Sequence, residues 1–242
     1  MTVPDLPVGP LASKVDAVPP AGASLHGKYT SVVKLATGHA PALYKSLGGQ
    51  ENAWRWTYML RGGFDTLEEY QEFTTDLAGS TDPYAYAILS APEAETSANP
   101  EPVGVFSFLN ISAPQRRIEI GSVNLGDRLK RTRMATEAFY LFIKHAFEDL
   151  HYHRVEWKAN ALNAPSLSSA KRLGFVYEGI FRKHMIVQGR LRDTAWFSIT
   201  DDEWPVVKQA FDTWLEESNF DAEGQQKRTL QAIRDEIQKS TS

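Results

Sequence analysis

The pattern of apolar and polar residues along the chain predicts alternating strands and helices. Apolar residues at helical spacing, together with helix start and stop signals, predict helices at 39–47, 65–77, 134–150, 166–173 and 201–217. Runs rich in β-branched and aromatic residues predict strands at 25–35, 84–90, 103–111, 118–125, 154–159, 176–187 and 192–199. This order predicts an α/β fold, in which a mixed sheet carries helices on both faces.

The chain divides into three parts by the same pattern. Residues 1–24 contain five prolines and little periodicity, so we expect an extended N-terminal arm. Residues 25–218 hold the predicted elements and form a single domain. Residues 219–242 are expected to form a C-terminal tail with a helix, because Leu230, Ile233 and Ile237 share one helical face.

Composition excludes several classes of protein. The 26 basic and 30 acidic residues give a net charge of −4, which argues against a nucleic-acid partner. The absence of cysteine rules out a disulfide scaffold, a thiolate metal site and a cysteine nucleophile. No metal site, no membrane span and no secretion signal are expected, so a cytoplasmic location is the default.

The connection between the predicted strand 118–125 and the helix at 134–150 has the character of an anion site. A strand that turns into a helix start gathers unpaired backbone N–H groups, and such groups bind phosphates. Four cations lie in the connection, namely Arg128, Lys130, Arg131 and Arg133. The segment matches neither a Walker A loop nor a dinucleotide fingerprint. A solvated surface loop is the alternative interpretation.

The motifs that follow give a more specific indication. They are Glu119-Ile120-Gly121, Ala135-Thr136-Glu137-Ala138, Asn163-x-x-Ser166, Leu173-Gly174-Phe175, Glu178-Gly179 and Gly189-x-x-x-Asp193. In this order and spacing, over residues 25–205, the sequence resembles the GNAT superfamily of acetyl-CoA-dependent N-acetyltransferases. It looks most like the branch of the RimJ/RimL ribosomal-protein N-terminal acetyltransferases.

The resemblance implies a mostly antiparallel sheet that splays into a V between strands 118–125 and 154–159. The pantetheine arm of acetyl-CoA would lie in the V, along Ser122, Val123, Asn124 and Leu125. The pyrophosphate loop would comprise Lys130, Arg131, Thr132, Arg133, Met134 and Ala135. Arg133 stands where the family has glycine, and its side chain would then contact phosphate. Asn163 would bond the pantetheine, and Lys171 or Arg172 would neutralise another phosphate of the nucleotide.

The implied chemistry is direct acetyl transfer to a primary amine in a ternary complex. Ser166 matches the family position near the thioester sulfur, which makes it the candidate general acid; the alternative is an ordinary first-turn residue of a helix. Glu156 and Glu119 compete as general base, because a buried strand carboxylate has a raised pKa. A structural salt bridge with Arg117, Arg154 or Lys158 is the alternative for both glutamates.

The acceptor that the resemblance implies is a small-molecule amine, an amino acid or a protein N-terminus. Its candidate contacts lie in the aromatic segment and on the last two strands, and they are Trp54, Trp56, Tyr58, Arg182, His184 and Asp193. Packing in the core is the alternative for the aromatic residues. The protein is expected to be a monomer or a homodimer. The competing function is a catalytically silent GNAT-fold domain that binds CoA or a protein partner.

Overall fold

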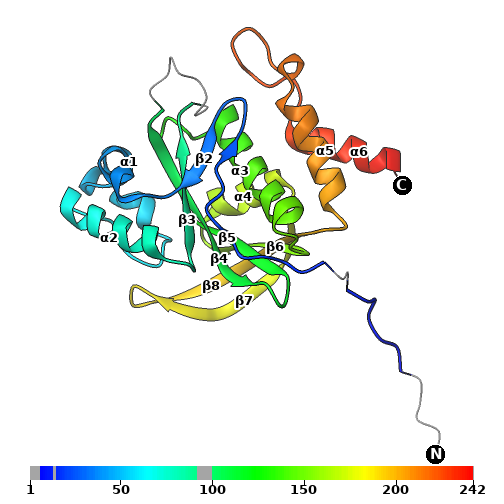
Figure 1. Cartoon of the computed structure of the whole chain (residues 1–242), viewed down its shortest axis with the longest axis horizontal. Coiled ribbons are helices and arrows are strands. Elements are labelled where there is room, and N and C mark those ends of the chain that lie inside the picture. Colours follow the sequence, from blue (N-terminus) through cyan, green and yellow to red (C-terminus); the bar gives the residue numbers. More distant parts are fainter. Residues whose placement is uncertain (1–5, 13–14, 92–99, 242) are drawn as a thin grey trace, which may run out of the picture.

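The computed structural model describes residues 6–12, 15–91 and 100–241, and its strands form one eight-stranded sheet (Figure 1). The strands are β1 (Leu25–His26), β2 (Ser31–Lys34), β3 (Tyr84–Leu89), β4 (Pro102–Ser112), β5 (Arg117–Leu125), β6 (Arg154–Asn160), β7 (Val176–Val187) and β8 (Arg190–Thr200). Their spatial order is β1-β2-β3-β4-β5-β6-β8-β7, and β5–β6 is the parallel pair among antiparallel neighbours. The predicted mixed, mostly antiparallel sheet is confirmed.

The helices cover both faces of this sheet. They are α1 (Ala40–Leu47), α2 (Leu67–Gly79), α3 (Arg133–Lys144), α4 (Ala164–Leu173), α5 (Trp204–Leu215) and α6 (Leu230–Thr241). Figure 1 shows α1 and α2 at one side of the sheet and α3 to α6 at the other. Successive residues of β3 alternate accordingly: Tyr86 and Ile88 are buried with α3, whereas Ala85 and Ala87 are buried with α1 and α2.

The parallel pair at the centre of the sheet is short. β5 and β6 are paired only at Arg117 with Arg154, Ile118 with Val155 and Glu119 with Glu156. Beyond Glu119 the two strands diverge, which is the splay that the resemblance implies. A bulge in β5 accompanies the divergence: Ser122 has a φ of 51°, and the register with β4 shifts at this point.

Two predicted elements are interrupted. The strand expected at 25–35 is two strands, β1 and β2, because the carboxylate of Glu137 on α3 binds the turn between them. It accepts hydrogen bonds from the backbone N–H groups of Lys28 (2.7 Å), Tyr29 (2.7 Å) and Thr30 (2.9 Å). The helix expected at 134–150 ends as α3 at Lys144 and continues as a π-helical turn, His145–Asp149.

The two ends of the chain contact the body of the fold. In the N-terminal arm, Ala17 is buried and the N–H of Val18 donates to the carbonyl of Leu150 at 3.0 Å. In α6, Leu230 and Ile233 are buried in the same core as α3. The division into arm, domain and tail stays a prediction. In the part of the chain that the structure describes, no helix has the length and apolar character of a membrane span.

Candidate functional site

A cleft of about 930 Å³ opens at the N-terminal end of α3, where the sequence predicts the anion site. Its charged lining residues are all cations, and they are Lys28, Arg131, Arg133 and Arg172. We call this cavity the cation cleft. No carboxylate lines it among the described residues. A helix N-terminus surrounded by cations favours the binding of phosphate groups.

The start of α3 presents donors to this cleft. Thr132 caps the helix: its hydroxyl oxygen accepts from the N–H of Ala135 at 3.2 Å and donates to the carbonyl of Leu129 at 2.7 Å. Because the cap engages the N–H of Ala135, the earlier N–H groups of Arg133 and Met134 are the ones available to a ligand. Arg131, with a φ of 60°, turns the chain into the helix.

Arg133 and Lys130, two of the predicted phosphate contacts, lie in different places. The guanidinium of Arg133 lies 3.8 Å from the ring centre of Phe220, so the C-terminal segment supports it inside the cleft. Lys130 is outside the cleft lining. Its ammonium lies 4.4 Å from the ring centre of Trp54 and 3.3 Å from the Asp127 carboxylate. The contact between Lys130 and a phosphate therefore stays a prediction.

Arg172, by contrast, lines the cleft from α4. It is half-buried, and its guanidinium donates to the hydroxyl of Thr136 at 3.1 Å. Burial lowers the pKa of Arg172, and no carboxylate pairs with it among the described residues. Its charge is thus available to an anionic ligand.

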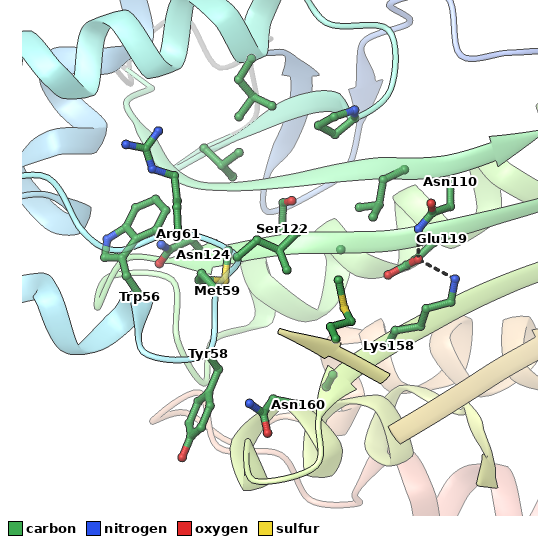
Figure 2. A pocket seen from close by; sticks show the side chains of 18 of the residues that line it. Trp56, Tyr58, Met59, Arg61, Asn110, Glu119, Ser122, Asn124, Lys158 and Asn160 are labelled. Carbon is green, nitrogen blue, oxygen red and sulfur yellow. Dashed lines mark hydrogen bonds and ion pairs between the residues drawn. The ribbon is translucent and has the colours of Figure 1, made fainter. Parts of the chain in front are cut away.

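A second cavity, of about 620 Å³, lies on the α1–α2 face where β5 and β6 diverge. We call it the central pocket. Figure 2 shows its polar side chains on β4, β5 and β6, which are Asn110, Glu119, Ser122, Asn124, Lys158 and Asn160. Trp56, Tyr58 and Met59 also line it, and Figure 2 shows Met59 near Ser122 and Asn124. Ser122 and Asn124 therefore face the pocket, whereas Val123 packs against the core and Leu125 reaches the cation cleft.

Two buried glutamates and one lysine form the polar floor of this region. Glu119 and Glu156 are each 4% exposed and are register partners on β5 and β6. The ammonium of Lys158 lies 2.9 Å from Glu119 and 2.8 Å from Glu156. Glu119 also accepts a hydrogen bond from the side-chain amide of Asn110 at 2.6 Å, as the dashed lines of Figure 2 show.

The two glutamates differ in pKa. Burial raises the pKa of Glu119, and Lys158 and Asn110 offset only part of that effect. Burial acts in the same direction on Glu156, but Lys158 and Arg154 outweigh it and hold the pKa of this carboxyl below its ordinary value. The expectation of a raised pKa at Glu156 is therefore wrong. Only Glu119 of the two lines the central pocket.

Asn163 and Ser166 form the first turn of α4. The side-chain oxygen of Asn163 caps the helix by accepting from the N–H of Ser166 at 3.3 Å. The Ser166 hydroxyl accepts a hydrogen bond from the indole N–H of Trp157 at 3.0 Å. Because the indole supplies the donor, the hydroxyl proton of Ser166 remains available for donation. Neither residue lines the central pocket or the cation cleft.

Three of the six predicted acceptor contacts line the central pocket, and they are Trp56, Tyr58 and His184. The other three lie outside it. Trp54 is 60% exposed and packs under Arg55 and Lys130. Arg182 is exposed on β7, outside the pocket lining. Asp193 is exposed and accepts from the backbone N–H of Lys183 at 2.7 Å, so it fixes an irregularity in β7.

Sequence reasoning gave no role in the central pocket to its four Lys and Arg residues, which are Arg61, Arg117, Lys158 and Arg192. Lys158 entered only as a salt-bridge partner, although its position two residues after Glu156 places it on the same face of the strand. Arg192 was not considered, although it shares a strand face with Thr194 and Trp196, which also line the pocket. No group of three or more metal-ligating side chains occurs in the ranges 6–12, 15–91 and 100–241.

We predict that Lys158→Met lowers the free energy of unfolding by about 3 kcal/mol at neutral pH, because two buried carboxylates lose their shared cation. Without that cation the folded-state pKa of each glutamate rises above its unfolded value. The loss should therefore shrink as the pH falls and both states become protonated. Urea unfolding between pH 4 and 8 measures this. Lys208→Met, which removes the surface partner of Glu148, is the control and should change stability little. A loss at Lys158 that does not depend on pH would contradict the charge argument.

Comparison with known proteins agrees with this arrangement. A family model described as an acetyltransferase (GNAT) domain matches residues 32–176. A crystal structure of a GCN5-related N-acetyltransferase from Brucella melitensis is 37% identical, covers 91% of this chain and 97% of its own, and has a TM-score of 0.85.

Two curated relatives match part of the chain. An N-acetyltransferase named p20 from Bacillus licheniformis is 33% identical over 43% of this chain. A Bacillus subtilis protein named for ribosomal N-acetyltransferase activity, YdaF, is 30% identical over 49% of it. The matches span 58% and 64% of the relatives' own lengths.

Proposed function

We propose, from the premise that this chain belongs to the GNAT acetyltransferase family, that it transfers the acetyl group of acetyl-CoA directly to a primary amine in a ternary complex. The observation that carries the proposal is the pair of cavities on either side of β5. Leu125 lines the cation cleft, and Glu119, Gly121, Ser122 and Asn124 border the central pocket. One strand thus joins a site for phosphates to a site that holds a base.

The residues present fit acetyl-CoA. The cation cleft supplies four positive charges and the start of α3 for its phosphates. Beyond Glu119, β5 has no partner on its β6 side, so its backbone groups are available to the amides of a pantetheine arm. The side-chain nitrogen of Asn124 is buried there without a hydrogen-bond partner among the described residues, and it offers one further donor. When bound, the thioester supplies an activated acetyl group.

Glu119 is the base in this proposal. Its carboxylate lines the central pocket and its raised pKa suits the acceptance of a proton from an ammonium ion, directly or through water. Lys158 holds the carboxylate in place from β6. Glu156, with a lowered pKa and with Arg154 and Lys158 as partners, is then a structural residue that keeps Lys158 between the strands.

Ser166 is the acid. Its oxygen is fixed by Trp157 on β6, at the edge of the divergence from which a thiolate would leave. Asn163 orients the same turn through its cap. The hydroxyl can then donate its own proton to the departing sulfur while the indole keeps the oxygen in position.

The first prediction of this proposal concerns the cation cleft. Acetyl-CoA at a hundredfold excess over its Kd should stabilise the fold by about 2.7 kcal/mol. Arg133→Glu should weaken binding at least about tenfold, because it places a negative charge among the phosphate contacts. Lys130→Glu is the matched control from the same loop, and its binding should stay within about threefold of the wild type. Isothermal titration calorimetry measures both. Equal losses in the two variants would show that the cleft is not the binding site.

The second prediction identifies the base. Because the pKa of Glu119 is raised, the rate should rise with pH through an acidic limb that lies above the titration range of an ordinary glutamate. Glu119→Gln should abolish this limb and lower kcat by roughly 100-fold or more. Glu156→Gln should keep the limb. Release of the CoA thiol, followed against pH, is the measurement, and a limb that disappears only in Glu156→Gln would reverse the assignment.

The third prediction concerns the leaving group. Ser166→Ala should lower kcat roughly 100-fold, the lower end of the range for one lost proton donor. The affinity for acetyl-CoA should change little, since Ser166 lies outside the cation cleft. Ser168→Ala, an exposed position of the same helix, is the control. If binding and turnover fall together, Ser166 serves the structure of α4 instead.

The competing function is a silent domain that binds CoA without turnover. The observation that favours it is Arg133, which stands where the GNAT family has glycine. The same assays separate the two functions. A silent domain would bind acetyl-CoA and release no thiol with any amine.

A further inference from the structure

Arg192 is a buried cation of the central pocket for which the proposed mechanism has no use. Its side chain comes from β8 and lines the pocket, and the residue is only 9% exposed. Its Nε is buried and has no hydrogen-bond partner among the described residues. No carboxylate of the described chain lies within ion-pair distance of it. A buried guanidinium in this condition is costly unless something else pairs with it.

The nearby acidic residues are already matched with other cations. Glu119 and Glu156 share Lys158, and Arg154 lies 2.9 Å from Glu156 and 2.6 Å from Glu178. Arg117 approaches Glu156 at 3.9 Å. Three carboxylates therefore face three cations, namely Lys158, Arg154 and Arg117. Arg192 is an additional positive charge, which the field of Glu119 reaches only at longer range.

The remaining cation of the pocket is engaged differently. The guanidinium of Arg61 lies 4.1 Å and 4.8 Å from the ring centres of Phe64 and Phe73, and the residue is exposed. Arg192 is thus the buried positive charge of the pocket that has no partner among the described residues. The phosphates of acetyl-CoA are not needed as the partner of Arg192, because the cation cleft at the other end of β5 supplies four cations for them.

We propose that the acceptor carries a carboxylate close to its amine, and that Arg192 binds this carboxylate in the central pocket. The inference rests on the proposed function, since it names the substrate class of the same site. A volume of about 620 Å³ suits an amino acid or the first residues of a peptide. The carboxylate is either the α-carboxylate of a free amino acid or an acidic side chain next to a peptide N-terminus. Arg192 supplies charge-assisted hydrogen bonds to either one.

Matched acceptor pairs test the proposal. One pair is serine and serinamide, and the other is a pair of peptide amides that begin Ser-Asp and Ser-Asn. In at least one pair, the carboxylate member should have a kcat/KM about tenfold higher or more. Arg192→Met should lower kcat/KM for that member roughly 10- to 100-fold and leave its neutral partner nearly unchanged. Comparing wild type and variant on the same compounds cancels differences between the amines' own pKa values.

Two controls keep a structural role distinct. Arg190→Met removes an exposed arginine from the same strand and should preserve the preference. Because methionine replaces an unpaired buried charge, Arg192→Met should keep or raise the Tm. A lower Tm together with an equal loss on both members of each pair would make Arg192 structural and overturn the proposal. If Arg192→Met does not fold, Arg192→Lys should retain part of the preference.

The proposal and the proposed function fail in different ways. If no amine causes thiol release, the function fails, and the Arg192 proposal is still decided by binding. With CoA present, the carboxylate compounds should raise the Tm of the wild type more than their neutral partners do. In Arg192→Met, the two members of each pair should raise the Tm equally. If amines are acetylated with no effect of the carboxylate, only the Arg192 proposal falls. The Arg192 proposal also falls if Arg192→Met lowers the rate with succinyl-CoA as the acyl donor and not the rate with carboxylate acceptors. The carboxylate that binds Arg192 would then belong to the acyl group.

Discussion

The architecture of the site depends on two carboxylates that are buried next to each other at the last paired register of β5 and β6. Glu119 and Glu156 would repel each other if Lys158 did not lie within 3 Å of both. Because this lysine extends from β6 and binds the carboxylate of β5, it joins the strands at the point where their backbone pairing ends. One ionic contact therefore lies at the point where the sheet opens, and it holds the Glu119 carboxylate there.

The opening of the sheet then separates two electrostatic environments along one strand. At Leu125, β5 leads into a cleft whose charged lining is wholly positive, and at Glu119 it carries a carboxylate whose pKa burial raises. The bulge at Ser122 lies between them and gives the strand an irregular edge that the diverging β6 no longer covers. A long ligand with an anionic end and an uncharged reactive end matches this sequence of environments. The C-terminal segment takes part as well, because Phe220 supports Arg133.

Sequence patterns predicted the sheet, most helices and the cation cleft, because hydrophobic period and helix start signals are local. They could not predict that the pKa values of Glu119 and Glu156 are shifted in opposite directions. Both glutamates lie on central strands with similar neighbours, and the difference arises from Arg154, which bonds Glu156 and leaves Glu119 to Lys158 and Asn110. Sequence patterns also could not predict which way each side chain of a loop points. Lys130 and Arg133 are three residues apart, yet contacts with Trp54 and with Phe220 place them on different surfaces.

The polar face of the sheet also shows how stability and function compete in this fold. A balanced set of ion pairs would have sufficed to fill the divergence of β5 and β6, and the groups around Glu156 form such a set. Arg192 adds a charge that this balance does not need, at a position where an apolar side chain of similar length would pack without desolvating a cation. A buried charge that has no partner among the described residues would be paired by a ligand that carries the opposite charge. By the same reasoning, the pocket holds the positive charge of Arg192, so an acceptor with a single positive amine and no anion would meet a repulsion that a carboxylate removes.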